Sequence, residues 1–434
     1  MPRLPPTLFH RARRISPHLA TLLPICRTIE SAQNELRWIR EYVRSTCPPT
    51  LTSRSKKPAA KRRNAPEHEI KTLVRRRGAG EPLQYILGSQ PFGNLDIECR
   101  RGVLIPRSET EDWVLRLESR TSDALLRRHS RHLRIEDSRA ENGRHEKGPL
   151  GRELKILDLC SGTGCIGLLL YSLVSHRLAK LRRLGRGLDL RPRVWGFDIE
   201  DRAVKLGRLN LSRNLESGAL FPTDERYMGG EFEEEDAQMD PKKDIRFAKA
   251  DIFDTSFIDR VRGATTSPVH ATRAMEYSKR GAIDILVSNP PYISQRGFNT
   301  DTERSVRTHE PRLALVPPPL SDSRPSDKEM TAESYRNPLG PENPEDIFYA
   351  RLLQIAAHLK PKIVAFEVGD LGQAMRVMEM ALGKAGKEMG LEWDVSEIWC
   401  DEMDGSQRVQ NLDGRDVLIM GNGNGRVVFL MRDG

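Results

Sequence analysis

Residues 156–167 read Ile-Leu-Asp-Leu-Cys-Ser-Gly-Thr-Gly-Cys-Ile-Gly, and this stretch decides the fold. The apolar run before Cys160 predicts a buried strand, and the spacing Gly162-x-Gly164-x-x-Gly167 predicts a tight turn that opens into a helix. Glycines let the backbone of such a turn approach a ligand, which the free N–H groups of the helix start can bind. Alone the spacing is a weak sign of a nucleotide site, because a tight turn can also be packed for its own sake.

Further strand candidates surround this stretch and indicate a doubly wound sheet. Apolar runs alternate with helical segments, and the runs are Lys155–Leu159, Arg193–Phe197, Asp284–Val287 and Lys362–Val368. This alternation is typical of a mainly parallel α/β sheet. Polar segments with too little apolar material for a core are expected to be surface insertions: 119–152, 176–192, 214–243, 257–281 and 319–345.

The chain before this sheet predicts a small helical domain followed by a hairpin. Leu36, Ile39 and Val43 give one face of an amphipathic helix. After a polar break at 47–66, the helical pattern resumes over Glu67–Arg77. The short β-prone pieces Leu95–Glu98 and Val103–Ile105 then predict a β-hairpin.

Composition narrows the class of protein. The 434 residues carry a formal charge of +9 and only six cysteines, which excludes a disulfide scaffold and permits, but does not require, nucleic acid as a partner. The longest apolar run, Cys165–Val174, is shorter than the roughly 18 residues of a membrane span. The first 29 residues contain five arginines and no acid, a composition typical of an organellar transit segment.

Two acids follow predicted strands at positions suited to a cofactor. Asp198 comes after Arg193–Phe197, where a carboxylate can accept both ribose hydroxyls of an adenosine-type cofactor. Asp251 follows Lys249-Ala250, where a carboxylate could meet the exocyclic amine of adenine. A solvated acid at a strand end is the alternative at both positions.

The segment Ser288-Asn289-Pro290-Pro291-Tyr292 directly follows the apolar strand and discriminates best between functions. Two prolines fix the chain and remove two N–H donors, so the Asn289 side-chain oxygen and the Pro290 carbonyl can both face one planar amino group. Tyr292 supplies a flat wall against a planar amide or base. The motif is therefore interpreted as a receptor for an NH2 group rather than as an ordinary Asn-Pro turn.

With these motifs the sequence resembles the class I S-adenosylmethionine-dependent methyltransferases, and within them the HemK/PrmC release factor glutamine methyltransferases. Besides the glycine loop and Asn289–Tyr292, the resemblance rests on three segments, Glu81–Gly88, Leu104–Glu111 and His309–Leu315. The quoted segments span most of the chain outside the expected insertions.

The resemblance implies a fold, a cofactor and a partner. It implies a class I Rossmann-like methyltransferase domain, placed at 109–434, preceded by a helical substrate-docking domain at 1–80 and a β-hairpin linker at 81–108. It implies methyl transfer from S-adenosyl-L-methionine to the glutamine side-chain amide in the Gly-Gly-Gln motif of a class I peptide chain release factor. We expect a monomer without a membrane or metal, with only an indirect ribosome context, located in mitochondria or otherwise in the cytoplasm.

Site residues carry over by motif. The implied catalytic residues, which form the glutamine pocket, are Asn289, Pro290, Pro291 and Tyr292. The implied cofactor-binding residues are Asp158, Cys160, Ser161, Gly162, Thr163, Gly164, Asp198, Asp251, Ile252 and Asn289. Two positions depart from the family pattern and bear on cofactor affinity: Cys160 stands where glycine is common, and Ile252 where an aromatic residue flanks adenine.

Three other functions stay open. Adenine N6 methylation of DNA or RNA is the nearest alternative, because a flipped adenine presents the same planar NH2 group to Asn289–Tyr292. An NAD-dependent oxidoreductase would use Gly162–Gly167 but leaves that motif unexplained. A catalytically inactive binding module is disfavoured by the intact amine receptor.

Overall fold

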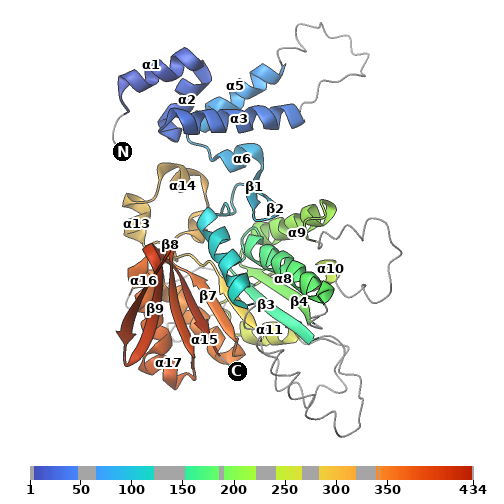
Figure 1. The fold of residues 1–434 in the computed structure, drawn as a ribbon, viewed down its shortest axis with the longest axis vertical. Helices are drawn as coiled ribbons and strands as arrows, with labels where there is room; N and C mark the ends of the chain where they lie inside the picture. The colour runs from blue at the N-terminus through green and yellow to red at the C-terminus, as the bar shows by residue number, and fades with distance from the viewer. Residues whose placement is uncertain are drawn as a thin grey trace, which may run out of the picture. The chain divides into compact units, whose positions relative to one another are not determined.

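The computed structural model describes residues 4–46, 65–121, 152–184, 190–220, 241–265, 283–318, 339–341 and 343–432 (Figure 1). The chain divides into two compact units. Unit 1 comprises Met1–Gln90, Cys99–Ile105 and Asp301–Glu310, and unit 2 comprises Pro91–Glu98, Pro106–Thr300 and Pro311–Gly434. Unit 1 is therefore built from three separate stretches of sequence.

Unit 1 is helical. Its helices are α1 (Pro6–Ile15), α2 (Pro17–Cys26), α3 (Ile29–Thr46), α5 (Ala65–Gly78), α6 (Leu83–Leu87) and α14 (Arg304–His309). The helices predicted around Leu36–Val43 and over Glu67–Arg77 are confirmed as parts of α3 and α5. Leu36, Ile39 and Val43 are buried, as the amphipathic pattern predicts.

A two-pronged ion pair joins α3 to α5 within unit 1. Arg77 donates from Nε to Glu35 Oε2 at 2.7 Å and from Nη2 to Glu35 Oε1 at 2.8 Å. Both side chains are largely shielded from water. Such fork-to-carboxylate pairs fix geometry as well as adding energy, so this pair sets how the two helices lie.

The predicted hairpin is half right. Leu95–Glu98 is β2, as predicted, but its partner is β1 (Ser89–Phe92), and residues 103–105 form no strand. Backbone groups of residues 103–105 form hydrogen bonds with side chains instead. The Val103 carbonyl accepts from Tyr85 Oη at 2.8 Å, and the Ile105 N–H donates to Glu310 Oε2 at 3.2 Å. These bonds satisfy groups that a strand would have paired.

Unit 2 contains a seven-stranded sheet of order β5-β4-β3-β6-β7-β9-β8. The parallel strands are β3 (Arg152–Leu159), β4 (Leu190–Asp198), β5 (Ile245–Lys249), β6 (Ile285–Ser288) and β7 (Ile363–Glu367). The antiparallel strands are β8 (Val395–Leu412) and β9 (Arg415–Met431), which the sequence analysis did not predict. The expected doubly wound α/β fold is confirmed.

Helices cover both faces of this sheet. The helices described in unit 2 are a helix over residues 108–121, α8 (Cys165–Arg183), α9 (Asp201–Glu216), α10 (Pro241–Asp244), α11 (Phe257–Thr265), α13 (Gln295–Thr300), η5 (Arg312–Ala314), η6 (Pro344–Asp346), α15 (Ile347–Leu359), α16 (Leu371–Leu382) and α17 (Lys384–Glu388). Leu157 and Leu159 of β3 pack with α11, α15 and α16, whereas Leu154 and Ile156 pack with α8 and the helix over 108–121. This alternation is what a strand buried on both faces requires.

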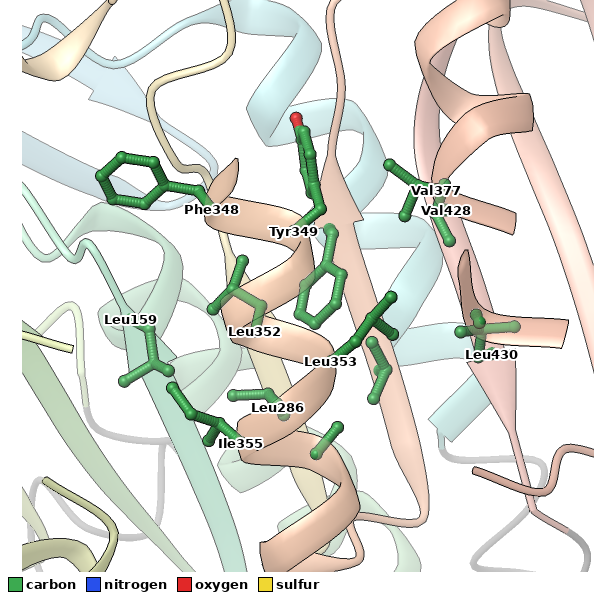
Figure 2. Packing of buried hydrophobic residues seen from close by; sticks show 14 of the residues in the cluster. Leu159, Leu286, Phe348, Tyr349, Leu352, Leu353, Ile355, Val377, Val428 and Leu430 are labelled. Atoms are coloured by element: carbon green, nitrogen blue, oxygen red, sulfur yellow. The ribbon is translucent and has the colours of Figure 1, made fainter. Parts of the chain in front are cut away.

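The apolar side of α15 shows how one face is filled. Figure 2 shows Tyr349, Leu352 and Leu353 of this helix among residues that come from the strands and from α16. All three side chains are fully buried. The pairing of Ser288 with Phe366 places the end of β7 beside the end of β6, where the predicted NH2 receptor begins.

The predicted insertions are partly wrong at their described ends, since α9 continues to Glu216 and α10 covers Pro241–Asp244 in the expected insertion 214–243. Residues 176–183 continue α8, with Leu178 and Leu181 buried, and residues 257–265 form α11, with Phe257 and Val261 buried. The exposed faces of both segments are polar, so the few apolar residues at helical spacing were not recognised in the sequence. The central parts of the expected insertions, over 122–151, 185–189, 221–240, 266–282 and 319–338, lie outside the described residues. No helix in the described ranges is both long and apolar enough to cross a lipid bilayer.

Candidate functional site

The glycine loop leaves β3 through three residues with left-handed backbone angles. Cys160, Gly162 and Gly164 have φ angles of 59°, 53° and 79°, and α8 starts at the next residue. Glycine adopts such angles freely, whereas a residue with a Cβ is strained by about 1 to 3 kcal/mol. Cys160, where the family commonly has glycine, therefore stands at a strained position.

Glycine serves different purposes at the two following positions. A Cβ on Gly164 would lie 2.6 Å from Cζ of Phe247, so this glycine is required by packing. A Cβ on Gly162 would meet nothing within 4 Å, so the loop borders open space at that point. A ligand that approaches the loop can thus reach its backbone at Gly162.

Asp198 ties the end of β4 to this loop. Its Oδ2 accepts from the Gly162 N–H at 2.9 Å, and its Oδ1 accepts from the Glu200 N–H at 2.9 Å. Burial raises the pKa of Asp198, while these backbone hydrogen bonds act in the opposite direction. The structure brings the predicted loop and the predicted ribose-binding acid together, and the sugar contact itself stays a prediction.

Asp158 and Ser161 each hold a buried oxygen without a partner. Asp158 is fully buried, its Oδ2 accepts from the Gly167 N–H at 3.1 Å, and its Oδ1 has no hydrogen-bond partner among the described residues. The Ser161 hydroxyl is likewise unpartnered within the described part of the chain. Unpaired polar atoms beside a loop that borders open space fit a bound cofactor with polar groups.

The predicted adenine-side residues lie after β5. Asp251 accepts from the Phe253 N–H at 2.9 Å, which closes its own turn. Ile252 is buried in the core, and its carbonyl accepts from Arg351 Nε at 2.6 Å. Its side chain is committed to packing, so a role toward adenine would fall to the surface that it shapes rather than to a free side chain.

The predicted NH2 receptor begins directly beyond β6 and lies beside the glycine loop. Leu159 pairs with Ser288 in the sheet, so Cys160 and Asn289 both follow a paired position at the same sheet edge. The Ser288 hydroxyl donates to the Leu159 carbonyl at 2.7 Å, which ties the two strand ends together. Pro290 and Pro291 are buried, whereas Asn289 and Tyr292 stay partly accessible.

A buried acid that the sequence analysis did not select holds this receptor. Glu367, the last residue of β7, is 3% exposed. Its Oε2 accepts from Thr110 Oγ1 at 2.7 Å and from Trp113 Nε1 at 2.8 Å, and its Oε1 accepts from Tyr292 Oη at 3.4 Å. Burial raises the pKa of Glu367, and the hydrogen bonds from Thr110 and Trp113 lower it. The sequence did contain a signal for this residue, because Glu367 is an acid at the end of the otherwise apolar strand Ile363–Glu367.

The turn after β7 holds Tyr292 at two further points. A Cβ on Gly369 would lie 3.1 Å from Cδ2 of the tyrosine ring, so only glycine leaves the ring its place without a shift. Gln373 Nε2 donates to the Tyr292 carbonyl at 3.2 Å, and its Oε1 accepts from the Gly369 N–H at 2.8 Å. Residues 367–373 thus contact the ring, the backbone and the hydroxyl of Tyr292.

We expect Asp158→Asn to raise the free energy of unfolding and to flatten its dependence on pH. Burial raises the pKa of Asp158 to about 8, so the folded state binds more protons than the unfolded state from about pH 4 to about pH 8. The contribution of Asp158 to the free energy of unfolding therefore falls as the pH rises through this range, by up to about 1.4 kcal/mol per pH unit.

Urea unfolding of the ligand-free protein at several pH values checks this. The gain from Asp158→Asn should be small near pH 4 and largest near pH 8, and a gain that does not change with pH would contradict the expectation. Asp259→Asn, at a side chain that is 83% exposed on α11, is the matched control and should leave the pH profile unchanged.

Several known proteins are similar in sequence to this chain. A family described as the PrmC N-terminal domain matches residues 26–88. The mitochondrial MRF1 N(5)-glutamine methyltransferase MTQ1 of Saccharomyces cerevisiae is 32% identical over 316 residues, 73% of this chain and 68% of the relative. The probable MRF1 mitochondrial N(5)-glutamine methyltransferase mtq1 of Schizosaccharomyces pombe is 29% identical over 72% of this chain and 73% of the relative.

A bacterial relative matches over a shorter stretch. The release factor glutamine methyltransferase of Thermodesulfovibrio yellowstonii is 32% identical over 154 residues, 36% of this chain and 41% of the relative. The family is shown by the Saccharomyces cerevisiae relative, which is 32% identical over 73% of this chain, and the helical unit, the glycine loop and the Asn289–Tyr292 segment accord with it. The chain belongs to the HemK/PrmC family of release factor glutamine methyltransferases and is an S-adenosylmethionine-dependent methyltransferase.

Proposed function

We propose that this protein methylates the side-chain amide nitrogen of the glutamine in the Gly-Gly-Gln motif of a class I release factor. The observation that carries the proposal is the position of Asn289, which follows β6 beside the glycine loop that follows β3. An NH2 receptor next to a cofactor loop is what methyl transfer to a planar nitrogen needs.

The protein's main task is alignment. An amide nitrogen is a poor nucleophile, and bound S-adenosylmethionine supplies a methyl group already activated on a sulfonium. The Asn289 Oδ1 and the Pro290 carbonyl each accept one hydrogen of the amide NH2 group, which directs the nitrogen lone pair toward the cofactor side. Orientation of this kind contributes about 7 to 11 kcal/mol in favourable cases.

The proposed cofactor contacts follow the loop geometry. The backbone N–H groups around Gly162 and the buried oxygens of Asp158 and Ser161 would hold polar groups of the cofactor, with Cys160, Thr163 and Gly164 completing the loop. Asp198 would accept from the ribose hydroxyls, and Asp251 and Ile252 would border the adenine. Tyr292 would lie as a wall beside the substrate amide.

Labelled S-adenosylmethionine tests the proposal directly. The protein is incubated with candidate release factors, each with the Gly-Gly-Gln glutamine intact or replaced by alanine, and with an adenine-containing oligonucleotide. We expect label only in a release factor with the intact glutamine. Label in the oligonucleotide would favour adenine N6 methylation, and label in the alanine variant would place the methyl group elsewhere.

Asn289→Ala is expected to abolish most transfer and to leave cofactor affinity within a few fold. Loss of one positioned hydrogen-bonding group raises a barrier by about 2.7 to 4 kcal/mol in a comparable oxyanion site. Turnover with the release factor and titration of S-adenosylhomocysteine measure the two effects separately. Asn411→Ala, in the exposed part of β8, is the control, and near-normal turnover of Asn289→Ala would refute the assignment.

We further infer that unit 1 docks the release factor. Trp38 on α3 is 43% exposed, although tryptophan is usually largely buried. Exposed tryptophans are frequent anchors of protein interfaces, and remote binding energy raises the rate only for a substrate that can use it.

Trp38→Ala should therefore lower kcat/KM about tenfold for the full release factor, a loss typical of an interface anchor, and leave a short Gly-Gly-Gln peptide unaffected. Val409→Ala, at another exposed apolar residue, should change neither value. Equal losses on peptide and protein would contradict docking at Trp38.

The location inferred for the protein is the mitochondrion. The first 29 residues, which contain no acid, support this location. The names of the two yeast relatives, which describe mitochondrial enzymes, support it as well. Residues 4–29 are also structured, since Ala12, Leu19 and Leu22 are buried in the core of unit 1. A fluorescent fusion of residues 1–45 expressed in yeast should colocalise with mitochondria, and a cytosolic signal would contradict the inference.

A further inference from the structure

The Thr110 hydroxyl lies between Asn289 of the amine receptor and Glu367, the buried acid that holds the receptor. Its Oγ1 donates to Glu367 Oε2 at 2.7 Å and accepts from Asn289 Nδ2 at 3.4 Å. Thr110 is 2% exposed and Glu367 is 3% exposed, so water does not compete for either group. Thr110 is therefore a buried link between the acid at the end of β7 and the amide beyond β6.

The number of protons on each group determines which group donates in these hydrogen bonds. With Glu367 ionised, its Oε2 can only accept, and it accepts from the Trp113 indole N–H at 2.8 Å and from Thr110 Oγ1 at 2.7 Å. A hydroxyl has one proton, and the proton of Thr110 goes to Oε2. Only lone pairs of Thr110 remain for Asn289.

This leaves one orientation for the Asn289 amide. Facing the lone pairs of Thr110, the asparagine must present its NH2 group to the hydroxyl, and its Oδ1 then points away from Thr110. That oxygen is left to accept a hydrogen bond from a substrate. In the opposite orientation two oxygens would face each other at Thr110, and an NH2 group would face the substrate.

We infer that Thr110 and Glu367 are positioning residues that fix the Asn289 amide and thereby make the site select a glutamine amide over a glutamate carboxylate. The inference rests on the proposed function, in which Asn289 receives the substrate NH2 group. With Oδ1 toward the substrate, a glutamine donates to it, whereas a glutamate offers only oxygens and meets repulsion. A site built around a substrate NH group discriminates strongly against an analogue that lacks it, because its buried polar group is left unpaired.

Thr110→Val tests the inference because valine keeps the shape of threonine and removes the hydroxyl. Without that acceptor the Asn289 amide can turn either way. We expect kcat with the release factor to fall about 10- to 100-fold, the range found when a residue that orients a metal ligand is removed. Thr110→Ser restores the hydroxyl and should recover most of that loss.

Binding provides a readout that a merely structural role would not change. Calorimetry in the presence of S-adenosylhomocysteine measures the affinity of the enzyme for two ligands. One is the unmodified release factor that serves as substrate in the labelling assay, and the other is its variant with glutamate in place of the Gly-Gly-Gln glutamine. The wild-type enzyme should prefer the glutamine form, and Thr110→Val should reduce that preference at least tenfold. Thr121→Val is the matched control, since Thr121 is buried on the same helix and its hydroxyl has no partner among the described residues.

The outcomes separate the two proposals. If Asn289→Ala abolishes transfer but Thr110→Val keeps the preference for glutamine, the role of Thr110 is refuted and the proposed function stands. Equal weakening of both substrate forms in Thr110→Val, or no preference in the wild-type enzyme, also refutes the inference. If Asn289→Ala retains transfer, the proposed function itself fails.

Discussion

The register of four parallel strands is the constraint on which the site depends. Leu159 of β3 pairs with Phe197 of β4 and with Ser288 of β6, and Ser288 pairs with Phe366 of β7. The residues that follow these four positions are Cys160, Asp198, Asn289 and Glu367. Because the strands run in the same direction, a loop, two acids and an amide line one edge of the sheet. A shift of one residue in any strand would remove its functional group from that row.

The sequence predicts the parts of this row that are encoded locally. Apolar runs predict β3, β4, β6 and β7, and the glycine spacing and the Asn-Pro-Pro-Tyr segment mark the turns that follow two of them. Parallel pairing then brings Gly162, Asp198 and Asn289 together. Each of these predictions rests on a pattern within about ten consecutive residues.

What the sequence could not predict depends on distant contacts. Thr110 and Glu367 are separated by 257 positions, and only the folded sheet brings them together. The strand β8 was missed because its outer part is exposed and polar, without the alternation that reveals a half-buried strand. The tail of α8 and the helix α11 were mistaken for insertions because their apolar residues are few, although Leu181 and Phe257 are well buried.

The division of unit 1 into three stretches has a consequence for how the chain folds during synthesis. Ser305 Oγ donates to the Gly80 carbonyl at 2.6 Å, and Glu310 accepts from the Ile105 N–H, so residues near position 310 close contacts with residues made far earlier. Loop closure over such separations slows folding. The amino-terminal helices emerge first from the ribosome, yet their unit is completed only after four strands of the seven-stranded sheet, β3 to β6, have also been made.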